Sequence, residues 1–441
     1  MTERLWLAVG CATAIAIPWA LRAQEIMAPP PAPPRHSEAP APETGPAAAF
    51  LAQEYGISID EAQERIALQS EIAKLVEQVK KSEDPGISGI WVQHRPVFQI
   101  FIGYTDPDDR KLLQFQIPPK IRNIVKLKKL PHSRRENQQL MEQLNTSLEA
   151  LGVAEKAIYI EEDTSELVAE IPPEQLTPQV RQILQSARKS IKIKDKRQPK
   201  PTAGSPKGVQ SGDYIDGGHY YWFRRPLTTD TSQQVEDSKG CSFAFEASYA
   251  GMNGILTAGH CNQGPDGTGY WHAINNHWVE LPSPEIARWA SGTKYDFQFH
   301  NIAGYLNDTW TYYFNQAAVV GLPSSGFLYV TGKVGYYGLT KGMTVCKSGR
   351  VTGISCGNIT SGNYPYNGAY GWIKVERASG MHLGRTGDSG GAVFSEATRD
   401  GQAVNAYGIV TAAQVFSNGS SEMIFTPIDY MEDYGVYVRI R

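Results

Sequence analysis

The chain has 441 residues and a formal net charge of −3, so its overall charge does not favour nucleic acid as a partner. Its length is sufficient for two or three domains. Glycine (42 residues) and tyrosine (22) are abundant, which favours β-structure with many turns over an all-helical protein.

Residues 1–23 have the layout of a secretory signal peptide. One arginine precedes an apolar run over residues 5–21, and cleavage is expected after Ala23. A membrane anchor that is not cleaved and a lipoprotein site at Cys11 are the alternatives. The signal predicts a secreted or periplasmic protein that has no membrane contact after cleavage.

The cysteines agree with export. Cys11 would leave with the signal, and an even number of cysteines then remains, which indicates two disulfides. The sequence alone permits three pairings. Metal binding is the alternative use of these thiols, but the chain contains no C-x-x-C pair. The four remaining residues are Cys241, Cys261, Cys346 and Cys356.

The next two segments differ in texture. Residues 24–49 are rich in proline and alanine and predict a solvated linker. Residues 50–185 predict an α+β region that contains no cluster of His, Cys and acidic residues. Its predicted elements are a helix opened by a capping box at Ser58 and Glu61, a hairpin over 89–104, a second helix over 134–152 and a second hairpin over 156–173.

Residues 186–212 contain eight Lys or Arg residues and one Asp. We interpret this basic segment as an exposed linker in which proteolytic processing occurs, rather than as a nucleic-acid site. From residue 213 to 441, short apolar runs alternate with turn residues, which predicts an all-β domain. A helix signal comes last, with Pro427 suited to its first turn and Gly435 to its end.

The segment Gly387-Asp388-Ser389-Gly390-Gly391 fits two kinds of nucleophile loop, that of an α/β-hydrolase and that of a chymotrypsin-like protease. Either needs a base to activate Ser389. An α/β-hydrolase places its histidine after the serine, but the last of the nine histidines is His382. The candidate base lies upstream, at His260. A lone histidine is more often a core residue, but its neighbour Cys261 and the downstream serine loop favour catalysis.

Four segments resemble the bacterial chymotrypsin-fold serine proteases of the α-lytic protease and streptogrisin group. They are CSFAFEA…GILTAGHC (241–261), VCKSGRVTGISCG (345–357), GRTGDSGG (384–391) and GIVTAAQVFSNG (408–419). The resemblance covers 213–441 nearly throughout, and parts of 50–185 resemble that group's pro-region more weakly. It implies two six-stranded antiparallel β-barrels with a C-terminal helix, preceded by an α+β pro-region that acts as folding template and inhibitor.

The resemblance also implies residue roles. His260 would be the general base, Ser389 the nucleophile and Asp296 the acid that orients the histidine. Asp308 is the alternative acid. The backbone amides of Gly387 and Ser389 would form the oxyanion hole. No cofactor or metal is implied.

Three structural details follow from the same resemblance. The disulfides would be Cys241–Cys261 and Cys346–Cys356. Lys347 stands where close relatives have an arginine, and would pair with Asp388. That pair would allow activation without a new N-terminal amine. The cut that releases the mature domain is expected near Gly212.

The expected walls of the specificity pocket contain no acidic residue. Segments 382–386 and 408–414 are both free of Asp and Glu, so we predict cleavage after small to medium apolar residues rather than after Lys or Arg. Arg385 would instead attract an acidic residue if it points inward. The residues expected to bind substrate are Gly384, Val410, Thr411, Ala412 and Ala413.

Together these features predict a secreted serine endopeptidase made as a pro-enzyme. Its partners would be protein or peptide substrates and its own pro-region, with no nucleic acid, and we expect a monomer. The alternative is a protease-like binding protein that has lost activity, although the chain retains both His260 and Ser389.

Overall fold

The computed structural model of the chain describes residues 44–188, 190–196, 220–222, 240–261, 270–274, 277–302, 318–321, 327–378, 382–398, 401 and 403–441. We call residues 44–196 the N-terminal region and residues 220–441 the β region. The predicted signal peptide, most of the predicted linker 24–49 and the predicted cut near Gly212 lie outside the described residues. Within these ranges, no helix is both long and apolar enough to cross a bilayer.

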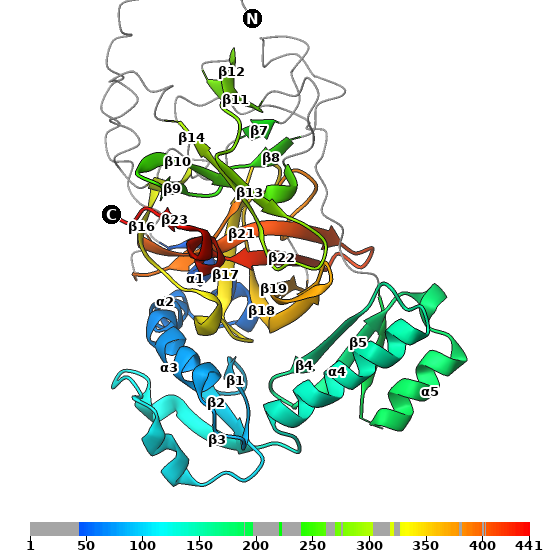
Figure 1. Cartoon of the computed structure of the whole chain (residues 1–441). Coiled ribbons are helices and arrows are strands. Elements are labelled where there is room, and N and C mark those ends of the chain that lie inside the picture. Colours follow the sequence, from blue (N-terminus) through cyan, green and yellow to red (C-terminus); the bar gives the residue numbers. More distant parts are fainter. Residues whose placement is uncertain are drawn as a thin grey trace, which may run out of the picture. The chain divides into compact units, whose positions relative to one another are not determined.

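The N-terminal region is built of helices and short strands (Figure 1). Its 3-10 helices are η1 (Asp109–Gln114), η2 (Arg122–Ile124) and η3 (Pro173–Gln175). Its α-helices and strands are α1 (Pro46–Tyr55), α2 (Ile59–Ala67), α3 (Gln69–Lys81), β1 (Ile87–Gln93), β2 (Gln99–Tyr104), β3 (Val125–Lys129), α4 (Arg134–Ala150), β4 (Ala157–Glu161), β5 (Glu166–Ile171), α5 (Pro178–Ala187) and β6 (Lys192–Asp195).

Local capping determines where several of these helices begin. The Ser58 side chain accepts a hydrogen bond from the amide of Glu61 at the start of α2, and Ser133 and Glu136 form a complete capping box at the start of α4. Both helices and both hairpins of this region occur where the sequence predicts them. The first predicted helix is divided at Leu68 into α2 and α3.

Two elements lie in segments predicted as linkers. Helix α1 starts at Pro46, four residues before the predicted start of the α+β region at 50. Strand β6 lies inside the segment 186–212 and pairs in parallel with β5. Ile191 and Ile193 alternate with lysines there and pack against the core between α4, α5 and β5, so the apolar alternation outweighs the basic composition.

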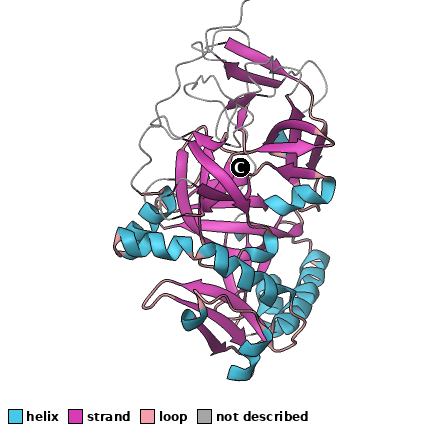
Figure 2. Cartoon of the chain, turned by 90° about the vertical axis from the view of Figure 1, so that its left-hand side faces the viewer, coloured by secondary structure: helices cyan, strands magenta, loops and turns pink. Residues whose placement is uncertain are grey.

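The β region is composed almost entirely of strands (Figures 1 and 2). Its 3-10 helices are η4 (Gly259–Cys261), η6 (Tyr336–Gly338) and η7 (Ile428–Tyr434). Its strands are β7 (Tyr220–Trp222), β8 (Gly240–Ser242), β9 (Glu246–Tyr249), β10 (Met252–Thr257), β11 (Tyr270–Ile274), β12 (His277–Leu281), β13 (Ile286–Trp289), β14 (Asp296–Asn301), β15 (Ala318–Gly321), β16 (Phe327–Lys333), β17 (Thr344–Gly349), β18 (Gly353–Tyr366), β19 (Ala369–Arg377), β20 (Ala392–Glu396), β21 (Ala403–Val415), β22 (Ser421–Pro427) and β23 (Val436–Val438).

Six strands of the β region pair in a closed ring. The order β17-β18-β19-β22-β21-β20 returns to β17, and every pairing in it is antiparallel. Closure leaves none of these six strands without a partner on either side, which removes the exposed edges of an open sheet. The described strands between residues 220 and 302, together with β23, form two further sheets, in the orders β12-β11-β7-β8 and β13-β14-β10-β9-β23. The arrangement of two six-stranded barrels remains a prediction.

The predicted C-terminal helix occurs at the predicted place, as a short 3-10 helix. Residues Ile428–Tyr434 form the 3-10 helix η7, with Pro427 at its N-cap and Gly435 in the left-handed conformation at its end. The chain then continues into β23, which pairs with β9. Strand β23 forms one edge of the sheet β13-β14-β10-β9-β23.

The N-terminal and β regions share apolar cores. Phe50 and Leu51 of α1 belong to the same buried cluster as Cys346 and Phe394 of the β region. Helix α3 packs in a second shared cluster, and β4 and β5 contribute to a third with Tyr364 and other residues of the β18–β19 hairpin. Such burial is the main favourable contribution to association.

Candidate active site

His260 lies in η4, directly after strand β10, and is buried. The residue before it must be small, because a Cβ on Gly259 would lie 2.3 Å from the carbonyl oxygen of Arg288 in β13. The glycine therefore lets η4 approach β13 closely. The glycine before His260 thus allows η4, and with it the imidazole, to lie close to β13.

Asp296 is the first residue of β14 and is fully buried. Its Oδ1 accepts a hydrogen bond from the backbone amide of His260 at 2.8 Å, and its Oδ2 lies 2.8 Å from His260 Nδ1. A carboxylate at Nδ1 keeps the proton on that nitrogen and leaves Nε2 as the acceptor. Nε2 has no hydrogen-bond partner. The alternative acid, Asp308, lies outside the described residues.

Ser389 lies in a loop shaped by two glycines in the left-handed region, Gly387 (φ 99°) and Gly390 (φ 85°). The Ser389 carbonyl accepts a 2.7 Å hydrogen bond from the amide of Ser242. Ser242 adjoins Cys241, whose disulfide to Cys261 is next to His260. This chain of contacts brings the serine loop and the histidine into one neighbourhood.

The Ser389 hydroxyl donates to the carbonyl oxygen of Thr411 at 3.3 Å. It therefore does not use His260 Nε2 as its acceptor. Catalytic hydrogen bonds of this kind are often formed only when substrate is bound. In the described part of the chain, the amides of Gly387 and Ser389 donate to no acceptor, which leaves both available to an oxyanion.

The predicted pair of Lys347 and Asp388 is a contact in the structure. Lys347 Nζ lies 3.2 Å from Asp388 Oδ2, and both side chains are fully buried. Asp388 also accepts hydrogen bonds from the amides of Val351 (2.8 Å) and Arg385 (2.9 Å) and from the hydroxyl of Thr352 (2.7 Å). The carboxylate thereby ties the serine loop to the turn between β17 and β18.

These contacts decide the charge of Asp388. Burial would raise the pKa of Asp388, but the positive charge of Lys347 and the hydrogen bonds from Arg385 and Thr352 outweigh it and hold the pKa below its usual value. Burial lowers the pKa of Lys347, and Asp388 opposes that effect. We treat the pair as ionised at neutral pH, because Nζ also donates to Thr352 and to the carbonyl of Gly353.

The predicted substrate-binding residues lie on two adjacent segments. A Cβ on Gly384 would lie 2.8 Å from the Cβ of Ala413. The amide of Gly390 donates to the carbonyl of Val410 at 2.8 Å, which joins β21 to the serine loop. Thr411 and Ala412 follow on the same strand. Val410 belongs to a buried apolar cluster, and Arg385, the alternative source of specificity, is exposed.

The sequence did not single out three residues that support this site. Ser242 anchors the serine loop through its amide and donates its hydroxyl to the carbonyl of Gly387 at 2.9 Å. Thr352 bridges Lys347 and Asp388. Trp289 lies with its ring 5.5 Å from that of His260. Their roles depend on contacts between distant segments, and no local pattern marks them.

Both predicted disulfides are present, Cys241–Cys261 and Cys346–Cys356. Cys241, His260 and Cys261 have ligand atoms within 4.8 Å of one another, as a metal site would. However, the two sulfurs are bonded to each other, and a metal would need them as thiolates.

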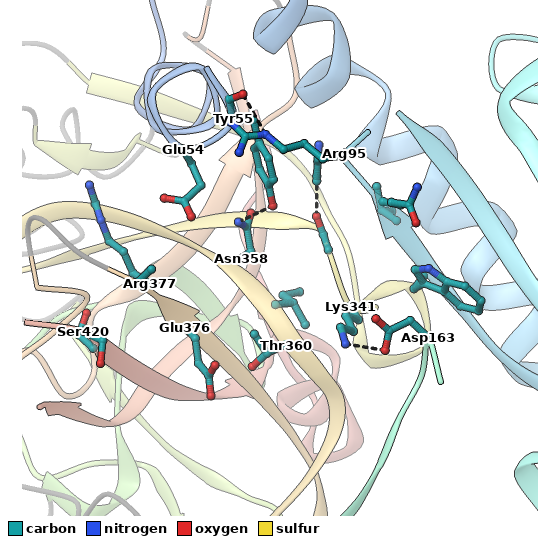
Figure 3. A pocket seen from close by; sticks show the side chains of 18 of the residues that line it. Glu54, Tyr55, Arg95, Asp163, Lys341, Asn358, Thr360, Glu376, Arg377 and Ser420 are labelled. Carbon is teal, nitrogen blue, oxygen red and sulfur yellow. Dashed lines mark hydrogen bonds and ion pairs between the residues drawn. The ribbon is translucent and has the colours of Figure 1, made fainter. Parts of the chain in front are cut away.

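A cavity of about 610 Å³ lies elsewhere, between the N-terminal and β regions. Figure 3 shows it lined by Tyr55 and Arg95 on one side and by Asn358, Glu376 and Arg377 on the other. None of His260, Asp296 and Ser389 lines it. The three candidate catalytic residues therefore lie outside this cavity.

No protein-family model matches the chain. Solved structures similar to it include Nocardiopsis protease (22% identity, 51% of this chain and 98% of that one, TM-score 0.33) and Thermobifida fusca protease A (20%, 52% and 100%, 0.35). A glutamic-acid-specific serine protease that uses a histidine triad in substrate binding is similar at 20% identity, over 45% of this chain and 94% of that one, with a TM-score of 0.35. At this level of similarity, function has to be inferred from the residues of the chain itself.

Proposed function

We propose that this chain is a secreted serine endopeptidase made as a pro-enzyme. The observation that carries the proposal is the buried 2.8 Å contact between His260 Nδ1 and Asp296 Oδ2, which leaves Nε2 free to act as a base. The loop that bears Ser389 adjoins it through Ser242 and the first disulfide. This is the arrangement that nucleophilic catalysis by serine requires.

In the proposed reaction, the Ser389 hydroxyl exchanges the Thr411 carbonyl for His260 Nε2 and attacks the carbonyl carbon of a peptide bond. Nε2 takes the hydroxyl proton and then gives it to the leaving amine. The amides of Gly387 and Ser389 stabilise the negative charge on the oxygen. Water, activated by the same nitrogen, then hydrolyses the acyl-enzyme and regenerates Ser389.

Ser389→Ala tests this proposal directly. Peptide hydrolysis should fall by about 10⁴-fold or more, because only binding and the oxyanion hole remain, and the variant should accumulate as uncut precursor. A fluorophosphonate probe should label the natural protein at Ser389. Ser147→Ala, at a partly exposed position of α4, should change neither result. Absence of labelling and turnover in the natural protein would favour the alternative, an inactive protease-like binding protein.

We also propose that the N-terminal region is the pro-region. Its helix α1 completes an apolar core of the β region, and this supports a role as folding template. Residues 213–441 refolded alone should give less than about a tenth of the activity obtained when residues 44–196 are added as a separate chain, because mostly non-local β-topologies fold slowly. Equal yields with and without the added chain would remove the folding role.

The proposed specificity is for small to medium apolar residues before the cut bond. Val410 is buried in an apolar cluster, and Ala413 closes against Gly384, so neither wall offers a counter-charge to a basic side chain. A peptide-library profile dominated by Lys or Arg at that position would contradict the assignment. A dominant preference for Glu there would indicate that Arg385 turns inward.

A further inference from the structure

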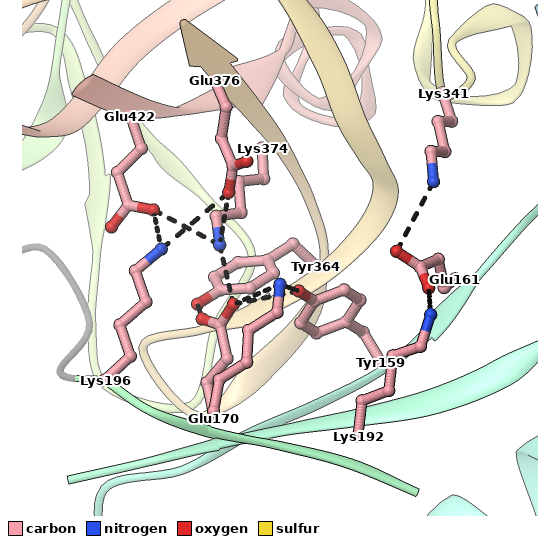
Figure 4. A network of polar contacts seen from close by, with 11 residues as sticks. Tyr159, Glu161, Glu170, Lys192, Lys196, Lys341, Tyr364, Lys374, Glu376 and Glu422 are labelled. Carbon is pink, nitrogen blue, oxygen red and sulfur yellow. Dashed lines mark hydrogen bonds and ion pairs between the residues drawn. The ribbon is translucent and has the colours of Figure 1, made fainter. Parts of the chain in front are cut away.

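A cluster of charged side chains lies where the last described residues of the N-terminal region meet the β region. Figure 4 shows Glu170, Lys374, Glu376, Glu422 and Lys196 in one network. Two of these five residues, Glu170 and Lys196, belong to the N-terminal region. The other three belong to β19 and β22 of the β region.

The side chains that the β region contributes to this network carry a net negative charge. Two carboxylates, Glu376 and Glu422, face one ammonium, Lys374, at 3.1 and 3.3 Å, so the three side chains carry a net charge of −1. Glu422 is fully buried, and its Oε1 has no hydrogen-bond partner. Among the described lysines of the β region, Glu422 contacts Lys374 alone and shares it with Glu376, an arrangement that favours the approach of another cation.

Lys196 supplies that cation. Its Nζ bonds to Glu422 and lies 3.9 Å from Glu376 Oε1. It also lies 5.0 Å from the centre of the Phe416 ring, within the range of a cation–π interaction. Two carboxylates and an aromatic face thus hold one ammonium of the chain's own N-terminal region.

Strand β21 gives the approximate distance between the Lys196 ammonium and Ser389. Thr411, whose carbonyl accepts the Ser389 hydroxyl, lies three residues before Gln414, which pairs with Glu422 across β21 and β22. Three residues of strand span about 10 Å. Residues 412–415 of β21 pair with β22 but lie beyond the pairing with β20. An extended peptide that runs along these residues would therefore reach Glu422 with a side chain about three to five residues from the bond to be cut. The cavity between the regions is lined by Glu376, Phe416 and Lys196 at the same place.

We propose that Glu376, Glu422 and Phe416 form a substrate subsite that binds a lysine or arginine side chain remote from the scissile bond, and that Lys196 occupies this subsite in the precursor. The inference rests on the proposed function, because it names a substrate feature that the protease recognises. It is separate from the apolar pocket beside Ser389. The enzyme would select substrates with an apolar residue at the cut and a basic residue a few positions away.

The test uses the mature protease recovered after secretion of the full chain. In a peptide library with an apolar residue before the scissile bond, Lys, Arg, Gln or Glu is placed in turn at each of five positions on either side. One position, three to five residues from the bond, should show kcat/KM for Lys and Arg roughly tenfold above that for Gln, since hydrogen bonds to charged groups contribute most. Glu should be the poorest residue there.

Variants identify the subsite. Glu376→Gln and Phe416→Leu should each bring the Lys-to-Gln ratio close to one, and Glu422→Gln should do the same if it folds. Glu432→Gln removes an ion pair with Lys333 in another part of the β region and should keep the ratio.

Two results would overturn the subsite. One is that no position of the peptide shows a preference for Lys, and the other is that the ratio is unchanged in both Glu376→Gln and Phe416→Leu. In either case, hydrolysis of the Gln peptides would still support the protease. Loss of all hydrolysis above the Ser389→Ala level would overturn both.

Discussion

Two buried lysines in the β region each hold a carboxylate, but the two pairs connect different parts of the molecule. Lys347 and Asp388 both belong to the β region, and their contact ties the serine loop to the β17–β18 turn. Lys374 contacts Glu170 of the N-terminal region at 2.9 Å. The first pair would persist after the N-terminal region is removed, whereas the second would be broken.

The comparison shows why similar ion pairs have different consequences. Removing one partner of a buried pair leaves an uncompensated charge and costs several kcal/mol. For Asp388 that cost falls on the loop that carries Ser389, the proposed nucleophile. For Glu170 it falls on the association of the two regions, because Lys374 keeps Glu376 and Glu422 as partners in the β region.

The largest effect is expected for Lys347→Met. This change leaves the Asp388 carboxylate buried without its cation, so the serine loop should distort and kcat/KM should fall by about 10²-fold or more. Activity assays measure the effect on the serine loop, and circular dichroism shows whether the variant still folds. Lys347→Arg restores the charge and should retain most of the activity. Full activity in Lys347→Met would show that the pair does not support the loop.

A smaller effect, confined to the precursor, is expected for Glu170→Gln. Burial would raise the pKa of Glu170, but Lys374 and Lys196 lower it to about 2, so the carboxylate is charged in the precursor and stabilises it. In the inactive Ser389→Ala background, the change should lower the melting temperature by a few degrees, for a loss of about 1–3 kcal/mol.

Two controls test whether this effect comes from the buried pair and is limited to the precursor. Glu77→Gln breaks a pair with Lys81 in which both side chains are exposed and should shift the melting temperature by less than about one degree. In the proposed maturation the N-terminal region is removed, so the mature protease prepared from a Glu170→Gln precursor that retains Ser389 should be as active as the natural one. A lower activity of this mature protease would contradict the conclusion that Glu170 acts only in the precursor.

The third effect depends on pH and concerns a second contact between the regions. Glu396 in β20 accepts a 2.7 Å hydrogen bond from the amide of Ala47 at the start of α1, and burial raises its pKa to about 7. Because the folded pKa exceeds the unfolded value of 4.5, its contribution to stability is present below pH 4.5 and is lost as pH rises through 7. The contribution of Glu170 to stability has the opposite pH dependence. Its contribution is present above pH 4.5 and is lost as pH falls through about 2.

The contribution of Glu396 is read as a difference between two proteins, because His94 and His300, whose pKa values burial lowers to about 4, change stability in the opposite direction over the same pH range. In urea unfolding, the stability of Ser389→Ala minus that of Ser389→Ala with Glu396→Gln should fall by up to about 3 kcal/mol as pH rises from 4.5 to 8. Below pH 4.5 this difference should stay constant. Gln69→Ala breaks uncharged hydrogen bonds to Thr344 and Ser395 in the same contact and should lower stability equally at every pH. A Glu396→Gln profile parallel to the natural one would contradict the assignment.

Much of the local structure was predictable because its causes are local. Ser58 and Ser133 mark helix starts through contacts with residues three positions away, and alternating apolar residues mark both hairpins. The candidate triad was found because the residues around His260 and Ser389 form recognisable motifs. The alternation at Ile191 and Ile193 was also present, but the basic composition concealed it.

The sequence by itself determined the order of the elements, the residue types available for catalysis and the even number of cysteines in the predicted mature chain. The tertiary structure decided which of these residues meet. It places Thr352 between Lys347 and Asp388, helix α1 in a core of the β region, and Lys196 against Glu422. Such contacts join segments up to hundreds of residues apart, and their strength depends on burial and mutual geometry, which no single stretch of sequence contains.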